Sequence, residues 1–325
     1  MIDPLIVARD LHLASTIIVA GVIFFDLFIA VALWRTKPPL LAARAVFQSS
    51  SRNVLWVCLA LSIASALAWL WLLSMRIGHQ DFRDVISDGT VWRVLSQTQF
   101  GFAWQMRLLL GAGLAVCLLL KGTSGGRLAG GLVFLAGLLA AAYLGSLAFA
   151  GHGAEGLGIE QHIHLAADFL HLIAAGLWLG ALVPLVLLLV HLGRFQEDGW
   201  ASAAARAGSR FSTLGIFAVG ILLVSGLVNA AFLLGGMHSL IDTAYGRLLL
   251  LKVVLFAAMV CLAGINRQYL VPRLYGSRGT GGASATARRF VQSALVEIAM
   301  GLAIVCIVGA LGIMAPANDM AAYLH

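Results

Sequence analysis

The sequence has few charged residues and no closely spaced pair of cysteines. Asp, Glu, Lys and Arg make up 11% of its 325 residues, whereas a soluble domain carries about 25%, so an ordinary soluble protein is excluded. No CxxC occurs, which excludes a local thiolate zinc site and a local redox pair. We expect the isolated thiols to behave as small buried apolar groups, and they belong to Cys58, Cys117, Cys261 and Cys306.

The motifs of nucleotide-driven and hydrolytic enzymes are also missing. The sequence contains no GxxxxGKS/T and no DKTGT-like phosphorylation sequence, which argues against an ATP-driven pump and against a bound nucleotide. It has no HExxH and no recognisable Ser–His–Asp order, so a hydrolase is not predicted. The chain is therefore not predicted to be an enzyme.

Long hydrophobic segments make up most of the chain. Hydrophobic residues make up 61% of the chain, and its mean hydropathy is +0.97. A membrane-spanning helix needs about 20 apolar residues, so the sequence predicts an all-α, polytopic membrane helix bundle that forms one domain over residues 1–325. The eight predicted spans are about 6–34, 53–75, 102–120, 128–149, 164–191, 211–234, 247–265 and 291–313.

The basic residues are distributed unevenly between the two sides of these spans. Four alternate loops, 35–52, 121–127, 192–210 and 266–290, hold 14 of the 21 Lys and Arg residues. Such an excess marks the cytoplasmic side of a membrane protein, so both termini are predicted to face outward, and the charge of +7 is not evidence for a nucleic-acid partner. The 14 residues are Arg35, Lys37, Arg44, Arg52, Lys121, Arg127, Arg194, Arg206, Arg210, Arg267, Arg273, Arg278, Arg288 and Arg289.

Three segments outside or at the ends of the spans carry expectations of their own. The start of the chain has no basic leader and no small-residue cleavage site, so we expect the first span to be retained and not to act as a signal peptide. The longest outward loop, 76–101, is expected to contain a short interfacial helix. The Gly- and Ser-rich stretch within 266–290 is expected to be flexible.

Most of the nine histidines lie near the predicted outward ends. Only His191 lies toward the basic side. Imidazole is a ligand for copper, and it also binds zinc, iron and haem iron, so the asymmetry predicts a metal or cofactor site open to the outside. The alternative, that outward loops simply hold polar residues, stays open. The eight outward histidines are His12, His79, His152, His162, His164, His171, His238 and His325.

The fifth span carries two of these histidines and an aspartate at helical spacing. His164, Asp168 and His171 are at positions i, i+4 and i+7, which places them on one helical face, and Trp178 continues that face. His171 lies about 10 Å deeper than His164. A carboxylate between two imidazoles can bind a metal directly or orient an imidazole. The other interpretation is a hydrogen-bonded pair that only fixes helix packing.

Two further histidines could complete such a site. His152 lies in the glycine-flanked sequence AGHG, in the loop that leads to His164. His12, in the first span, is predicted to lie at a depth comparable to that of His171. The predicted metal ligands are therefore His152, His164, His171 and His12, with Asp168 as a direct ligand or as a support for one.

The remaining polar groups within the spans have several possible roles. Arg107 and Lys252 lie near outward ends, so we expect their side chains to snorkel toward the surface. Glu297, near the start of the last span, is a candidate proton or ion relay. Asn229 either lines a path or joins two helices. Asp26 is expected to pair, to line a path or to reach the interface.

Several segments, taken in order, resemble the copper resistance D (CopD/PcoD-like) family of bacterial inner-membrane proteins. The most specific is DFLHLIAAGLWLGALVPL at 168–185, followed by YGRLLLLKVVLFAAMVCLAGINRQYLVPRL at 245–274. LSQTQFGFAWQMRLLL at 95–110, AGHG at 150–153, FSTLGIFAVGILLVSGLVNA at 211–230 and EIAMGLAIV at 297–305 also match. The resemblance implies a copper ion moved between periplasm and cytoplasm, with a periplasmic copper-binding partner of the C type.

Two other functional hypotheses remain open at this stage. Bundles with one histidine on each of two helices commonly hold a bis-His haem, so His12 and His171 could bind haem b in a protein that transfers electrons. A scaffold whose outward histidines only dock a partner would bind neither metal nor haem.

Overall fold

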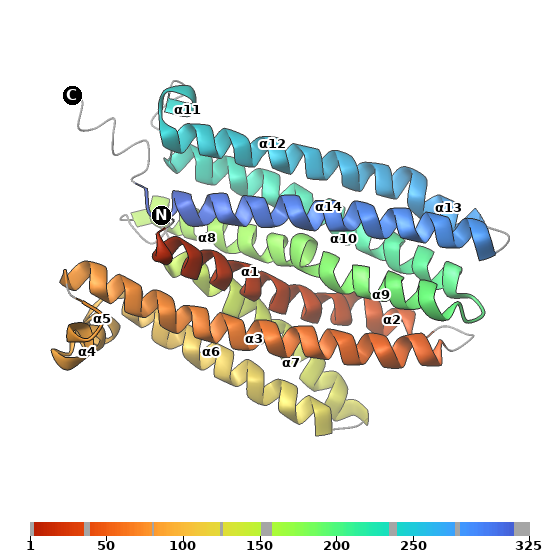
Figure 1. Cartoon of the computed structure of the whole chain (residues 1–325), viewed down its shortest axis with the longest axis horizontal. Helices are drawn as coiled ribbons and strands as arrows, with labels where there is room; N and C mark the ends of the chain where they lie inside the picture. The colour runs from red at the N-terminus through yellow and green to blue at the C-terminus, as the bar shows by residue number, and fades with distance from the viewer. Residues whose placement is uncertain are drawn as a thin grey trace.

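The computed structural model describes residues 3–35, 40–79, 81–123, 126–150, 158–233, 239–276 and 280–314. Within these residues the chain is helical and contains no strand. Eight helices are long and apolar enough to cross a membrane, which confirms the predicted all-α membrane bundle. They lie side by side along one axis (Figure 1), and they span Pro4–Leu33, Leu41–Gly78, Gln99–Thr123, Leu128–Ala150, Gly158–Phe195, Trp200–Leu233, Ala244–Gly276 and Gly281–Leu311.

Three of these spans are interrupted by a π-helical turn, and one ends in a 3-10 turn. The turns widen or tighten the helix locally, and π-helical turns are frequent at functional sites. The first span consists of α1 (Pro4–Phe25), η1 (Asp26–Ala30) and α2 (Val31–Leu33), and the fourth of α7 (Gly126–Gly145) and η2 (Ser146–Ala150). The fifth consists of α8 (Gly158–Ala175), η4 (Gly176–Gly180) and α9 (Ala181–Phe195), and the seventh of α12 (Ala244–Ile265), η5 (Asn266–Leu270) and α13 (Val271–Gly276).

The other four spans are single helices, and several helices are longer than their hydrophobic runs predict. They are α3 (Leu41–Gly78), α6 (Gln99–Thr123), α10 (Trp200–Leu233) and α14 (Thr280–Leu311). Residues 41–52, 200–210, 266–276 and 280–290 are thus helical, although they were predicted to lie in loops. The Gly- and Ser-rich stretch at 275–289 was expected to be flexible, but it is helical from Thr280 onward, since hydropathy marks the apolar part of a helix and not its end.

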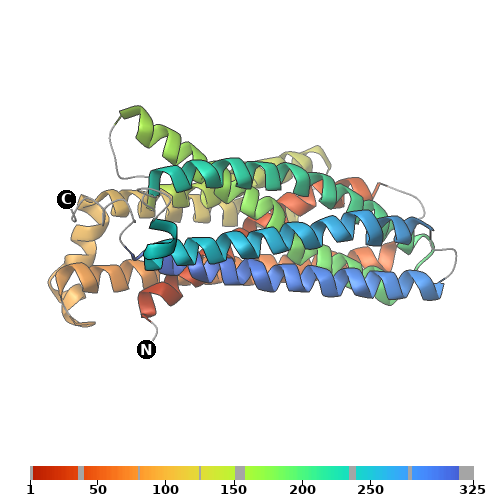
Figure 2. The same ribbon diagram turned by 90° about the horizontal axis from the view of Figure 1, so that it is seen from above.

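The two ends of the bundle carry different elements. The short helices α4 (Asp84–Ser87), α5 (Thr90–Gln97) and α11 (Ser239–Asp242) lie at the end where α1 begins, here called the amino-terminal end. Helices α4 and α5 confirm the expected short helix in 76–101. At the opposite end, here called the basic end, the helices α2, α9 and α13 end (Figure 2).

Local capping fixes several helix starts. Asp3 accepts a hydrogen bond from the Leu5 amide at 2.9 Å, and Pro4 opens α1. Thr243 caps α12 by accepting from Gly246 N at 2.9 Å. Such caps satisfy amides that the first turn leaves unpaired.

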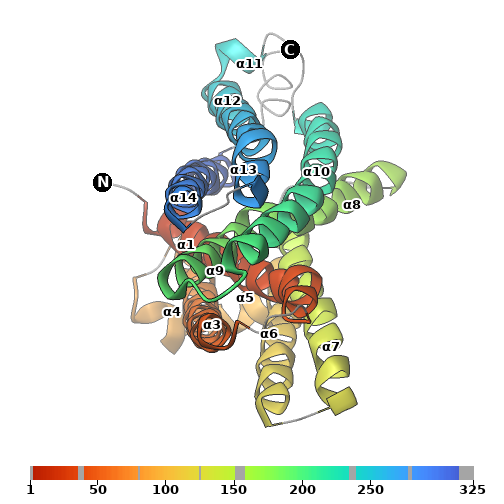
Figure 3. The same ribbon diagram turned by 90° about the vertical axis from the view of Figure 1, so that its right-hand side faces the viewer.

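Helix α1 lies at the centre of the bundle. It packs against α3, α7, α9, η4 and α14, and Figure 3 shows α1 and α9 surrounded by the other spans. Gly21 of α1 and Gly180 of η4 meet so closely that a Cβ on Gly180 would overlap the Ile17 carbonyl oxygen and lie 2.9 Å from Gly21 Cα. Small residues permit this approach between membrane helices.

The cysteines only partly follow the prediction. Cys117 is buried and Cys58 half-buried, but Cys261 and Cys306 are exposed on the outside of the bundle. Expected burial is therefore wrong for the last two, because a membrane helix exposes apolar residues to lipid as well as burying them.

Candidate functional site

The polar face predicted for the fifth span lies against α10. Asp168 on α8 accepts a hydrogen bond of 2.5 Å from Asn229 Nδ2 on α10. His171 bonds through Nδ1 to Ser225 Oγ at 2.9 Å. His164 and Phe232 stack with ring centroids 5.0 Å apart, so the three groups on α8 follow α10 in antiparallel register. We call this set of residues on α8 and α10 the α8–α10 seam.

Hydrogen bonding at Ser225 favours one tautomer of His171. A serine hydroxyl has one hydrogen, and Ser225 Oγ donates it to the Ile221 carbonyl at 2.6 Å. With this donation the oxygen accepts from His171, and His171 Nδ1 carries the ring proton. Its Nε2 then holds a lone pair, and no hydrogen bond to Nε2 is found among the described residues.

A cation on a third helix acts on the seam electrostatically. Lys252 on α12 is half-buried and interacts electrostatically with both Asp168 and His171. It therefore compensates the carboxylate charge within the bundle. The snorkelling expected for Lys252 stays a prediction.

A second polar cluster surrounds His12 between α1, α3, α6 and α7. His12 is 0% and Arg107 1% exposed. Arg107 Nη2 lies 2.6 Å from His12 Nε2, and Arg107 Nη1 donates to Ser146 Oγ at 2.7 Å and to the Tyr143 carbonyl at 2.8 Å. The snorkelling predicted for Arg107 is wrong, because its guanidinium finds these acceptors inside the bundle. No local pattern in the sequence predicts these acceptors.

The second cluster leaves His12 without a free ring nitrogen. A guanidinium can only donate, so His12 Nε2 is the acceptor and Nδ1 donates to the Ser62 carbonyl at 2.8 Å. Trp69 and Trp104 pack around the ring. As it stands, His12 has no lone pair for a metal or a haem iron. The structure therefore gives the bis-His haem hypothesis no support.

The other predicted site residues are spread over the molecule. His152 lies outside the described residues. Trp178, in η4, packs edge-on against Phe256 of α12, with centroids 5.8 Å apart. Glu297 is buried beside Trp178 and Asn266. The residues that the structure describes contain no group of three or more His, Cys, Asp or Glu side chains placed to share a metal ion.

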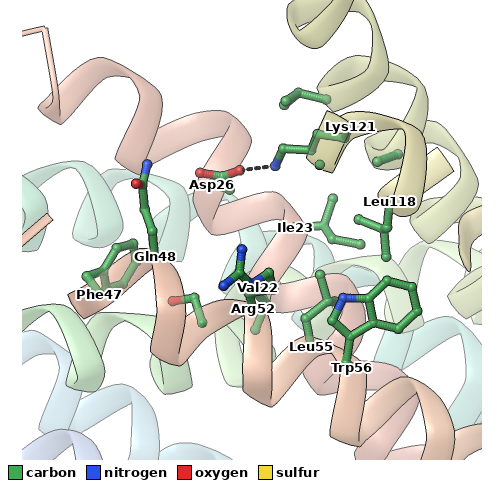
Figure 4. Close-up of a pocket in the computed structure, with 14 residues that line it drawn as sticks. Val22, Ile23, Asp26, Phe47, Gln48, Arg52, Leu55, Trp56, Leu118 and Lys121 are labelled. Atoms are coloured by element: carbon green, nitrogen blue, oxygen red, sulfur yellow. Dashed lines mark hydrogen bonds and ion pairs between the residues drawn. The ribbon is translucent and has the colours of Figure 1, made fainter. Parts of the chain in front are cut away.

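A further polar pair lies near the basic end. Asp26 of η1 accepts from Lys121 Nζ at 2.7 Å, across a cavity of about 260 Å³ that Arg52 and Trp56 also line. Figure 4 shows the ion pair at this cavity. The pairing considered for Asp26 is thus observed. It needs no ligand to balance its charge.

A polytopic helix bundle with buried imidazole and carboxylate groups is an integral membrane protein, and comparisons with known proteins identify its family. The family model described as "Copper resistance protein D-like, N-terminal domain" matches residues 1–163, and the model described as "Copper resistance protein D" matches residues 205–311. The chain belongs to the copper resistance protein D family.

Three curated relatives agree with this assignment. The chain is 30% identical to inner membrane protein YebZ of Escherichia coli (strain K12), over 96% of this chain and 98% of that protein. It is 30% identical to copper resistance protein D of Pseudomonas syringae pv. tomato, over 86% of this chain and 84% of that protein. A match to copper transport protein CutJ of Bacillus subtilis (strain 168) has 41% identity over 42% of this chain and 23% of that protein.

No solved structure matches the chain. The family and the eight apolar helices make it a multi-pass protein of the bacterial inner membrane. Copper resistance and copper transport are the functions named in this family.

Proposed function

We propose that this protein moves copper across the inner membrane and that the α8–α10 seam is its entry site. The observation that carries the proposal is the free Nε2 of His171. Copper binds the lone pair of a neutral imidazole, and the second ring nitrogen is commonly hydrogen-bonded so that the tautomer and ring orientation are fixed. His171 has this arrangement, with Ser225 as its support.

The three polar groups of α8 form a short route along one helix. His164 has no hydrogen-bonding partner among the described residues and lies one or two turns nearer the amino-terminal end. Asp168 lies between the two imidazoles, where its carboxylate lowers the electrostatic cost of a passing cation. In this proposal His164 receives copper and His171 holds it deeper in the bundle, with His152 as a further ligand.

The orientation of the protein determines where this route opens. If the basic end is cytoplasmic, as the excess of Lys and Arg predicts, then His164 faces the periplasm. A periplasmic copper-binding protein of the C type would deliver or accept the ion there. The direction of movement then depends on that partner and on the driving ion.

The proposal is tested by copper binding to the purified full-length protein. His171→Ala should lower the number of copper ions bound per protein, because it removes the free imidazole nitrogen. His162→Ala is the matched control: His162 is exposed on the same helix and bonds through Nδ1 to the Gly158 carbonyl at 2.7 Å. The proposal is wrong if both variants bind as much copper as the unchanged protein.

Acid should release this copper. A protonated imidazole has no lone pair for a metal, so copper affinity falls as pH falls through the range in which histidine titrates. Copper bound through His171 should therefore be lost on acidification. Any copper that the His171→Ala variant still binds is held at other sites.

A further inference from the structure

A buried carboxylate lies apart from the α8–α10 seam, on the last span. Glu297 of α14 is 1% exposed, and Asn266, the first residue of η5, is 4% exposed. Asn266 Nδ2 donates to Glu297 Oε1 at 2.7 Å. The π-helical turn that begins at Asn266 and the one that holds Trp178 both contact α14, so two irregular turns flank this carboxylate.

One oxygen of each side chain in this pair has no hydrogen-bonding partner. Glu297 Oε2 and Asn266 Oδ1 are both buried, and neither accepts a hydrogen bond of normal geometry within the described part of the chain, although the Trp178 indole lies close enough to interact with the carboxylate. An unpaired buried acceptor costs about 1–3 kcal/mol, and an isolated carboxylate inside a membrane bundle costs more. The cost of the unpaired acceptors and the cost of the buried charge would both fall if a proton were bound between Glu297 Oε2 and Asn266 Oδ1.

Protonation of Glu297 meets both requirements at once. A proton bound to Oε2 removes the negative charge and makes Oε2 a donor that can bond to Asn266 Oδ1. The acid and the amide then form a reciprocal pair, in which Asn266 Nδ2 donates to Oε1 and Oε2 donates to Oδ1. Release breaks the same O–H bond and returns the proton to water.

A cavity of about 200 Å³ connects this pair with the surface. Glu297, Asn266, Trp178 and Ser212 line it, together with apolar side chains of α10, α12 and α14. Arg267 also lines it and is exposed on the outside of η5, so the cavity extends toward the basic end. It is large enough for several water molecules.

The charges around the cavity favour a proton over a metal ion. Its described lining contains no thiol, thioether or imidazole, which are the ligands that hold cuprous ions. Arg267 is the one other charged group in that lining, so a divalent ion would leave an excess of positive charge. The other ionisable groups on helices packed against α14 lie outside it, and they include Arg9, Asp10, His191, Arg206, Arg210, Lys252 and Arg273.

We propose that Glu297 is a proton-binding residue, which pairs with Asn266 when protonated and exchanges its proton with the basic end through this cavity. The proton site does not depend on copper. Its coupling to transport rests on the function proposed above. The sequence has no motif for ATP-driven transport, and protons that move down their gradient through Glu297 would supply the energy instead.

Infrared spectroscopy of the copper-free, full-length protein in lipid tests the site. The acid-minus-alkaline difference spectrum should show the C=O stretch of a carboxylic acid. That band should be lost in Glu297→Gln and shifted in Asn266→Ala, which removes the hydrogen bond to the acid. Asp26→Asn is the control, because Asp26 is a carboxylate in another span that is already paired with Lys121, and it should keep the band.

The wild-type spectrum alone can overturn the proposal, so it does not depend on a variant that folds. A wild-type protein with no titrating acid band exchanges no proton at Glu297 over the pH range measured, which contradicts the proposal. A band that survives in Glu297→Gln belongs to another residue, and an unshifted band in Asn266→Ala contradicts the pairing.

Coupling is measured separately in proteoliposomes. A pH gradient should accelerate copper movement by the unchanged protein but not by Glu297→Gln, which should still bind copper at the seam. Acceleration that persists in Glu297→Gln would refute coupling through this residue. A protein that binds no copper at His171 would instead refute the entry site, and the infrared result would stand.

Discussion

His12 and Arg107 are joined by a hydrogen bond of 2.6 Å in which the guanidinium is the donor. Arg107 has no carboxylate partner among the described residues, so this imidazole is one of the few groups that stabilise a cation buried in the bundle. His12 therefore supports Arg107 and is not available as a ligand. This relationship separates His12 from His171, although the two histidines were predicted to act together.

Removing the imidazole should destabilise the protein. His12→Ala deletes a hydrogen bond to a charged group, worth about 1.5–3 kcal/mol, and leaves the Ser62 carbonyl without this donor. We expect the free energy of unfolding in mixed micelles to fall by at least about 2 kcal/mol. The exposed His162→Ala should change it by less than about 0.5 kcal/mol, and equal effects of the two substitutions would contradict the structure.

The same engagement of His12 predicts the colour of the protein. Both ring nitrogens of His12 are used, so a haem cannot be held between His12 and His171 in this conformation. We expect the visible spectrum of the purified protein, oxidised and then reduced with dithionite, to lack a Soret band. A Soret band that sharpens on reduction would show that His12 leaves Arg107 to bind iron.

The contact between Gly21 and Gly180 predicts a steric effect at the centre of the bundle. A methyl group at Gly180 would meet the backbone of α1 and not a movable side chain, so Gly180→Ala should separate α1 from η4. Overpacking of this kind costs about 1–3 kcal/mol. Gly193→Ala is the control on the same span, because nothing lies within 4 Å of the added carbon there. Equal unfolding midpoints for the two variants would show that η4 and α1 are not packed this way.

Much of the fold was predictable because it depends on local composition. Eight apolar runs gave the number of spans, and the helical period placed His164, Asp168 and His171 on one face. The structure shows that this face meets α10. Hydropathy gave the spans but not the helix ends, since the polar residues of 41–52 and 280–290 continue as helix beyond the apolar runs.

The partners of the buried polar groups could not be predicted from the sequence. Arg107 bonds to a carbonyl and a hydroxyl 36 and 39 residues away, and Glu297 bonds to an amide 31 residues away. Such pairs depend on which helices are neighbours and how they are rotated. Trp178 lies in the π-helical turn η4, which changes the register of the span locally and which the apolar run did not predict.

The orientation of the bundle remains a prediction that accessibility can test. Single cysteines at Ser87 in α4 and at Gln196, which follows α9, mark opposite ends of the bundle, and both side chains are exposed. In a variant without the four native cysteines, a membrane-impermeant thiol reagent applied to intact spheroplasts should label Ser87→Cys and spare Gln196→Cys. Labelling of Gln196→Cys alone would reverse the topology and put His164 on the cytoplasmic side.

The most direct test of the account is copper movement through the purified protein in sealed proteoliposomes. The unchanged protein should move copper faster than protein-free vesicles, and His171→Ala should reduce that rate to the protein-free level. His191→Ala should keep the rate, because His191 lies at the other end of the same span and bonds to Ser50. If His171→Ala moves copper as fast as the unchanged protein, the α8–α10 seam is not the copper route.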